Sequence, residues 1–185
     1  MTLQNQKIKR RILYLLAVAI GAWTLMLFSI PLLGPIWHFF NGDSVDYVGW
    51  RLPVPKGFYV RTLESGPTMW RPTVGIPFLN VAYGHISVFR LPSDQEPFVH
   101  TRDLQRFSEA ISEEAQRSGY RFGSSRVVRI GKTAAYCLEF SRSNERPRFL
   151  VRCRVENATI VFFYEGDDRY LPDFFSMLEG ISPKV

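Results

Sequence analysis

A long run of apolar positions dominates the N-terminal part of the chain. From Ile12 to Phe40 there is no Asp, Glu, Lys or Arg. At roughly 1.5 Å per helical residue, the part of this run that precedes Pro31 already matches the thickness of a bilayer core. The pattern predicts one transmembrane helix over 12–34, ended by Pro31 and Pro35. The predicted membrane-anchor residues are Ile12, Leu16, Ile20, Trp23, Leu27 and Ile30.

A cleaved signal peptide is the alternative to an anchor. The apolar region of a signal peptide spans only about 7 to 15 residues and precedes a small-residue cleavage site. The sequence shows no such site after its longer run. We therefore favour the uncleaved helix.

The charges that flank the apolar run predict its orientation. No acidic residue precedes Asp43, and the short tail over 1–11 carries the basic residues Lys7, Lys9, Arg10 and Arg11. Such tails stay in the cytoplasm by the positive-inside rule. We expect a single-pass protein of the cell membrane, with the lipid bilayer as one partner. A juxtamembrane linker over 35–44 and a domain over 45–185 would then lie outside the cytoplasm.

Beyond the linker, the spacing of apolar positions predicts strands and then a helix. Alternation with a period of two predicts strands over Val45–Leu52, Gly57–Leu63 and Val81–Leu91. The stretch 66–80 is rich in proline and predicts a loop with a brief extended piece around Met69 and Trp70. In "TRDLQRFSEAISEEAQRSG" the apolar residues recur every three or four positions, which indicates an amphipathic helix. The residues of this stripe are Leu104, Phe107, Ile111 and Ala115.

The C-terminal third predicts a meander and a closing helix. Four alternating segments follow one another, "SSRVVRIG", "KTAAYCLEFSR", "RPRFLVRCRV" and "ATIVFFYEG". Short turns join them, so neighbours can form antiparallel hairpins. A helix is expected from Leu171 to Gly180, with Pro172 in its first turn. The whole pattern describes an α+β fold in which helices cover an antiparallel β-sheet.

Two motifs, together with this order of elements, resemble those of a known protein family. The meander begins with V-x-I-G-K-x-A at Val128, and the closing helix contains F-F-x-x-L-x-x-I from Phe174 to Ile181. Together with the preceding helix, they resemble the PsbP/Mog1-like fold from about Tyr47 to Ile181. The resemblance implies an accessory or binding module, in photosystem assembly among other settings, and it implies no catalytic residues.

The net charge does not indicate nucleic-acid binding. The chain is formally +6, but four of its 23 Lys and Arg residues belong to the tail before Ile12, which leaves 19 against 17 acidic residues. Nucleic-acid binding requires a basic face rather than a basic total. We expect no nucleic acid among the partners.

The triplet Gly131-Lys132-Thr133 is the end of a phosphate-loop motif, but its surroundings do not fit one. A phosphate loop has a glycine five residues earlier and a helix afterwards. Here Arg126 stands in place of that glycine, and strand-like "AAYCLEF" follows Thr133. The triplet therefore predicts a hairpin turn.

No catalytic, metal or cofactor residues can be assigned from the sequence. The three histidines, His38, His85 and His100, are not at metal-ligand spacing, and there is no G-x-S-x-G elbow. We expect neither an enzyme nor a bound cofactor.

Cys137 and Cys153 lie on neighbouring predicted strands. A hairpin whose paired positions sum to 290 places them opposite one another, close enough for a disulfide. However, burying Tyr136, Leu138 and Phe140 together with the apolar set around Val151 would put the sulfurs on opposite faces. This pattern favours free thiols, and a disulfide is the alternative that a bulge would permit.

Five arginines crowd the same hairpin: Arg142, Arg146, Arg148, Arg152 and Arg154. The simplest interpretation is a solvated face balanced by acidic residues. The functional interpretation is an interaction patch for anionic lipid headgroups or an acidic partner, with Trp70 on a second contact surface.

The leading hypothesis is a membrane-anchored, extracytoplasmic and non-catalytic binding or assembly module, with a membrane protein complex as its partner. The alternative is an anchored hydrolase or small-ligand sensor whose cleft is lined by His85, Trp70 and the arginine hairpin.

Overall fold

A computed structural model gives the fold of the chain and describes residues 3–71, 84–92, 95–143 and 148–184. Within the first helix, the side chains of 3–10 and 25–31 lie outside the described part. The elements are α1 (Leu3–Asn41), β1 (Ser44–Tyr47), β2 (Trp50–Pro53), β3 (Tyr59–Leu63), β4 (Gly66–Arg71), β5 (Gly84–Arg90), α2 (His100–Arg117), β6 (Arg121–Ile130), β7 (Thr133–Ser141), β8 (Phe149–Val155), β9 (Ile160–Gly166), the 3₁₀ turn η1 (Asp168–Tyr170), α3 (Leu171–Glu179) and β10 (Ser182–Pro183).

A seven-stranded antiparallel sheet forms the centre of the domain. Its strand order is β3-β4-β5-β9-β8-β7-β6, and the predicted meander supplies the last four of these strands. Gly131 has a φ of +55° in the two-residue turn between β6 and β7. A positive φ at the first central position is what a type II′ hairpin requires, so the predicted hairpin turn at the GKT triplet is confirmed.

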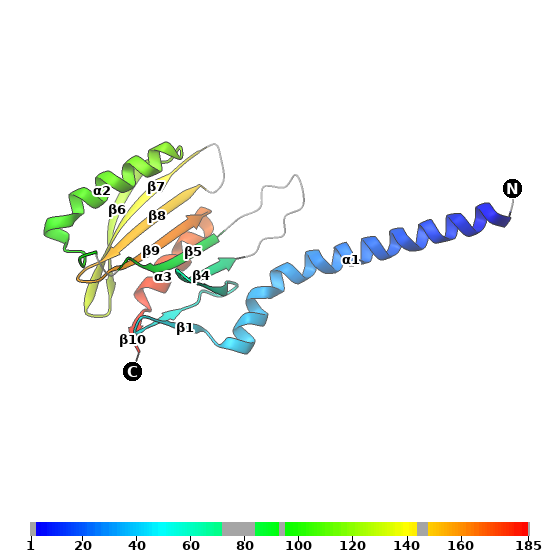
Figure 1. Ribbon diagram of the computed structural model, residues 1–185, viewed down its shortest axis with the longest axis horizontal. Helices are drawn as coiled ribbons and strands as arrows, with labels where there is room; N and C mark the ends of the chain where they lie inside the picture. The colour runs from blue at the N-terminus through cyan, green and yellow to red at the C-terminus, as the bar shows by residue number, and fades with distance from the viewer. Residues whose placement is uncertain (1–2, 72–83, 93–94, 144–147, 185) are drawn as a thin grey trace.

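A second sheet contains β1, β2 and β10. The prediction of one strand over Val45–Leu52 is wrong, because Val48 and Gly49 have φ values of +49° and +77° and turn the chain back on itself. The C-terminal β10 then pairs with β2. This small sheet lies beside the larger one, near the C-terminus (Figure 1).

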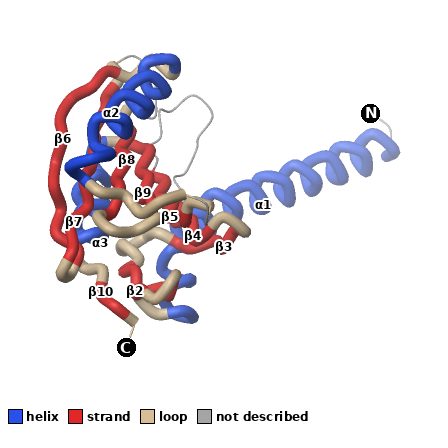
Figure 2. Tube along the Cα trace, turned by 60° about the vertical axis from the view of Figure 1, so that its left-hand side comes forward, coloured by secondary structure: helices blue, strands red, loops and turns tan. Residues whose placement is uncertain are grey.

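Helices cover both faces of the large sheet, as Figures 1 and 2 show. On one face, α3 contributes Phe174 and Leu178 to a core that also contains Val151 and Phe162 of the sheet. On the other face, α2 contributes Ala115 to a smaller cluster. The sheet members of that cluster are Leu138, Phe140, Leu150 and Phe163. The predicted α+β architecture with helices packed on an antiparallel sheet is therefore confirmed.

The prediction of free thiols is wrong. Cys137 and Cys153 form a disulfide, with their Cα atoms 4.0 Å apart, and they are directly paired in the β7–β8 register. The argument assumed that Leu138 and Phe140 share a face with Val151. They lie instead under α2, while Cys137 and Cys153 lie in the core under α3. Because both faces are covered, no bulge is needed for the sulfurs to meet.

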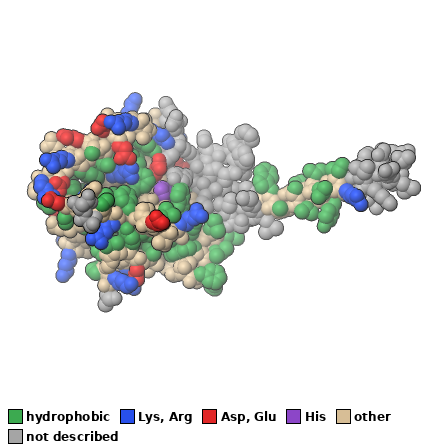
Figure 3. All heavy atoms as spheres, in the orientation of Figure 1, with side chains coloured by type: hydrophobic (Ala, Val, Ile, Leu, Met, Phe, Trp, Pro, Cys, Tyr) green, Lys and Arg blue, Asp and Glu red, His purple; other side chains and the backbone are tan. Residues whose placement is uncertain are grey.

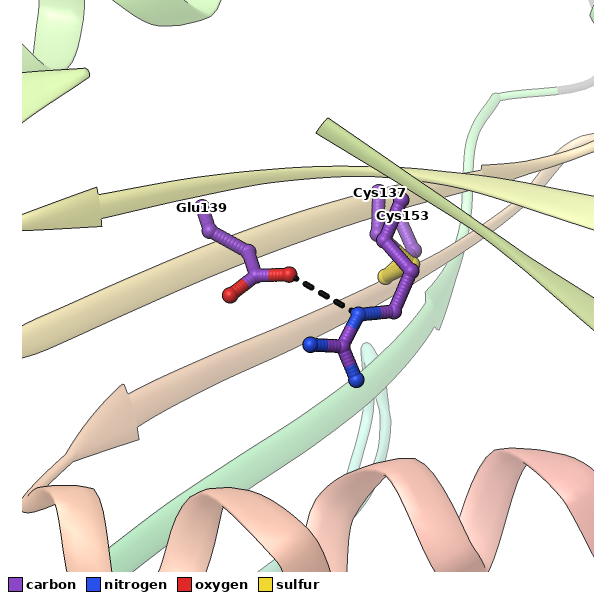
Figure 4. The surroundings of a disulfide bond; sticks show 4 residues. Cys137, Glu139 and Cys153 are labelled. Atoms are coloured by element: carbon purple, nitrogen blue, oxygen red, sulfur yellow. Dashed lines mark ion pairs between the residues drawn. A yellow bond between two sulfur atoms is a disulfide. The ribbon is translucent and has the colours of Figure 1, made fainter. Parts of the chain in front are cut away.

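An ion pair lies beside the disulfide. Arg126 of β6 is the cross-strand neighbour of Cys137, and its Nε atom lies 3.1 Å from Oε1 of Glu139 (dashed in Figure 4). The guanidinium of Arg126 also covers the ring of Phe175, 4.2 Å from its centroid. The Glu139 side chain is only 12% exposed, so Arg126 neutralises a mostly buried carboxylate next to the disulfide.

The N-terminal helix α1 extends away from the domain (Figure 1). It continues to Asn41 instead of ending at Pro31 and Pro35, and its last turns run in a different direction from the long part (Figure 1). Prolines bend a helix when the chain beyond them can still form helical hydrogen bonds. The helix therefore also includes most of the predicted linker over 35–44.

Packing against the domain explains why the last turns stay helical. Gly34 is buried against the backbone of Gly57, and Trp37 packs on the core. His38 links both sides of the junction, with Nδ1 2.8 Å from the Asp43 carboxylate and Nε2 3.3 Å from the carbonyl oxygen of Pro55.

The described side chains of α1 are mostly exposed, as the line of apolar side chains along it shows (Figure 3). Ile12, Leu16, Ile20 and Trp23 are each more than half exposed. Leu27, Ile30, Lys7, Lys9 and Arg10 lie outside the described side chains, whereas Arg11 is described and exposed. In the described part of the chain, no helix is both long enough and apolar enough to cross a membrane.

Candidate functional site

A groove between α2 and the sheet contains two of the five predicted patch arginines. Its volume is about 430 Å³. Arg152 and Arg154, at alternate positions of β8 on the face that α2 covers, contribute to its lining. The remaining lining residues are Phe89, Leu91, Phe98, Asp103, Arg106, Phe107, Ala110, Ile111, Glu114 and Val161.

Arg152 is held by contacts on both sides. One terminal nitrogen lies 2.8 Å from Oε1 of Glu114 on α2, and the guanidinium stacks 3.9 Å from the ring centroid of Phe163. Its side chain is only 18% exposed, and burial lowers its pKa from the ordinary arginine value. Arg152 therefore connects the helix to the sheet, and the simple interpretation of a solvated arginine does not describe it.

Arg154 has a different environment from Arg152. Its guanidinium lies 5.3 Å from the ring centroid of Phe98. Its Nε atom is buried and has no hydrogen-bond partner among the described residues. Burial lowers its pKa from the ordinary arginine value. A buried donor without a partner costs about 1–3 kcal/mol, more when charged, so this position favours an added acceptor.

The other patch arginines lie elsewhere. Arg142 lies near the end of α2, where it donates to the Ser118 carbonyl over 3.3 Å and covers the ring of Tyr120 at 4.6 Å. Arg148 is exposed just before β8. Arg146 lies outside the described residues. The described arginines therefore do not form one continuous patch, and on the face shown in Figure 3 basic and acidic side chains are interspersed.

Trp70 and His85, which the alternative hypothesis placed in a cleft, stack on one another. Their rings stack with centroids 4.0 Å apart, and the Nε2 atom of His85 is 3.0 Å from the Ser87 hydroxyl. Burial, and secondarily the charge of Arg152, lower the pKa of His85 to about 4. Neither Trp70 nor His85 lines the groove under α2. The Pro-rich loop that follows Trp70 lies outside the described residues from 72 to 83.

A second pocket of about 400 Å³ lies beside the GKT hairpin. Trp50, Ile130 and Ile181 line it together with Lys132. It does not resemble a phosphate site, because β7 rather than a helix follows the turn. Among the described residues, no group of three or more His, Cys, Asp or Glu side chains is placed to hold a metal ion.

The sequence could indicate Arg152 and Arg154 but not the groove that contains them. Phe98 belongs to the irregular segment before α2, and Glu114 lies on the helix between stripe positions. Their approach to β8 depends on how α2 lies across the sheet. The narrow apolar stripe of α2 was the one sequence feature that could have indicated a groove under this helix. In the structure, only Ala115 of α2 is buried.

Comparison with known proteins leaves the family open. No family model matches the chain, and no curated protein matches it. A similar solved structure is the solution structure of cyanobacterial PsbP (CyanoP) from Synechocystis sp. PCC 6803, with a TM-score of 0.47 and 12% sequence identity. The alignment covers 76% of this chain and 91% of that one. A structural similarity this weak does not show which family the chain belongs to or what the chain does. The PsbP/Mog1-like fold therefore stays a prediction.

Proposed function

We propose that this chain is a single-pass membrane protein that presents its α+β domain outside the cytoplasm as a binding or assembly module for a membrane complex. The observation that carries the proposal is the long helix α1, which leaves the domain with large apolar side chains in solvent. A stable soluble surface rarely exposes such a continuous apolar area. A bilayer or a partner helix would cover it.

The junction between α1 and the domain supports the same proposal. Gly34 and His38 fix the last turns of α1 against the β2–β3 connection. An anchor joined in this way would hold the domain close to the membrane surface rather than on a flexible tether. Partners within a membrane complex are then within reach.

The disulfide supports an extracytoplasmic location. Disulfides persist in oxidising compartments such as the periplasm and are rare in the cytosol. Cys137 and Cys153 are both buried in the main core, so their bond would form as the domain folds.

Fusion of alkaline phosphatase after Phe40 tests the topology, because this enzyme is active only outside the cytoplasm. We expect an active fusion, and an inactive one would remove the extracytoplasmic assignment. A fusion after Arg11, before the apolar run, is the matched control and should be inactive.

Purification of the full chain from solubilised membranes tests the role. We expect integral membrane proteins to co-purify with it in stoichiometric amounts. Recovery of the chain alone after chemical cross-linking in intact cells would contradict the assembly role without affecting the topology result.

A further inference from the structure

We propose that the groove between α2 and the sheet binds a single-chain fatty acid, with the acyl chain along the apolar lining and the carboxylate at Arg154. The groove lies within the domain and involves no residue of α1. The inference therefore does not depend on the proposed membrane anchor, and it assigns a ligand class that the assembly role does not require.

The apolar part of the groove fits an acyl chain. Its lining includes six large apolar side chains, those of Phe89, Leu91, Phe98, Phe107, Ile111 and Val161. Phe107 and Ile111 pack on the smaller core cluster but remain half-buried, so α2 leaves part of its apolar stripe uncovered. A volume of about 430 Å³ falls in the range of small-ligand sites, about 300–1,000 Å³. It suits one acyl chain rather than the two chains of a phospholipid.

The charges at the groove favour an anionic head group. Both acidic side chains of the lining already have partners. Glu114 pairs with Arg152 at 2.8 Å, and Asp103 accepts from Arg102 at 2.7 Å and from the backbone N–H of Val99 at 2.8 Å. Arg154 and Arg106 are the remaining cations of the lining, and the Asp103 carboxylate attracts both of them at longer range. The lining therefore has three arginines against two carboxylates.

Arg154 selects the kind of anion. Among the described residues its buried Nε–H has no acceptor. A carboxylate oxygen would satisfy this donor, while the other oxygen could accept from an adjacent guanidinium nitrogen. This side-on geometry matches the two oxygens and single charge of a carboxylate. A doubly charged phosphate would require more donors than this one guanidinium supplies.

Photolabelling tests the proposal with the full chain, held in nanodiscs of zwitterionic lipid if it purifies with membranes and in detergent-free buffer if it does not. The probe is decanoic acid that carries a diazirine on its chain, and labelled peptides are identified by mass spectrometry. We expect labelling of α2 and of β5 or β9, displaced by unlabelled decanoate and at least 10-fold less by decanol or acetate. Labelling confined to α1, or equal displacement by decanol, would overturn the proposal.

Variants separate the head-group contact from the chain contact. Arg154→Gln should reduce labelling of the groove about 10-fold or more, and Arg148→Gln, which removes an exposed arginine outside the lining, should leave it unchanged. Ile111→Trp should block labelling by filling the groove, which keeps the test decisive if Arg154→Gln unfolds. Unchanged labelling in folded Arg154→Gln and Ile111→Trp proteins would show that the acid binds elsewhere.

Discussion

Cys137 and Cys153 are directly opposite one another on β7 and β8, and their bond lies in the main core. Both residues are at most 1% exposed, and α3 covers them. The bond ties together two strands that are already neighbours in the meander. It closes a short loop, with a sequence separation of 16 residues, that contains the arginine-rich connection.

The double variant Cys137→Ala/Cys153→Ala should be destabilised by about 2–4 kcal/mol. In the chain-entropy model, cross-linking a loop of about 15 residues contributes roughly 3 kcal/mol by restricting the unfolded chain. Denaturant unfolding measures the change, and reduced wild-type protein should show a similar loss. Non-reducing mass spectrometry after alkylation provides the direct check, because two alkylated cysteines in the native protein would contradict the disulfide.

The regular elements could be predicted because each has its own local periodicity. The stripe from Leu104 to Ala115 predicted α2, and Pro172 followed by apolar spacing predicted α3. The order of the meander followed from the shortness of its turns. These features depend on residues within a few positions of one another, and the structure contains the corresponding elements.

The face of the sheet on which Cys137 lies could not be derived in the same way. Consecutive residues Cys137 and Leu138 are both buried, under α3 and α2 respectively. The sequence argument assigned one buried face to the hairpin, as is common in antiparallel sheets. Whether a second helix covers the other face is a tertiary property. The environment of Arg154 was missed for the same reason, because it depends on where α2 lies over β8.

Gly34→Ala should loosen the junction between α1 and the domain. A Cβ atom at Gly34 would overlap the carbonyl of Gly57, and backbone atoms on both sides leave little room to adjust. We expect a loss of about 1–3 kcal/mol in the free energy of unfolding of the full chain in detergent, as for other overpacked sites. Gly21→Ala on the same helix is the control, because no described atom lies within 4 Å of its added Cβ.

Limited proteolysis separates this local effect from general damage. Gly34→Ala should be cut faster near the α1–β1 connection than the Gly21→Ala control. Equal cleavage of the two variants would contradict the close contact between Gly34 and Gly57.

Gly131→Ala should destabilise the domain by roughly 1 kcal/mol without affecting any nucleotide-dependent property. The backbone at Gly131 has a φ of +55°, a region that costs an L-residue with a side chain about 1–2 kcal/mol. Its added Cβ meets no other atom of the described residues within 4 Å, so the expected cost is backbone strain. Thermal unfolding measures the effect. ATP or GTP binding by calorimetry that Lys132→Ala abolishes would contradict the assignment of GKT as a simple turn.

His85 should make the domain less stable in mild acid. The pKa of His85 is lowered from 6.5 to about 4, first by burial and then by the charge of Arg152. The unfolded chain therefore binds a proton at this residue between about pH 6.5 and 4, where the folded chain does not. Stability is lost as the pH falls through this range and levels off below it.

Comparison with His85→Gln separates the loss of stability caused by His85 at low pH from the loss caused by the carboxylates. His85 is partly exposed, so solvent screening reduces the expected difference to about 1–2 kcal/mol between pH 7 and pH 4.5. Denaturant unfolding at the two pH values should show a larger loss for the wild type than for the variant. His100→Gln is the control, because it replaces another histidine that stacks on an aromatic ring, Tyr136, outside the His85 environment. Equal pH dependence of the wild type and His85→Gln would mean that His85 protonates as readily in the folded chain as in the unfolded one.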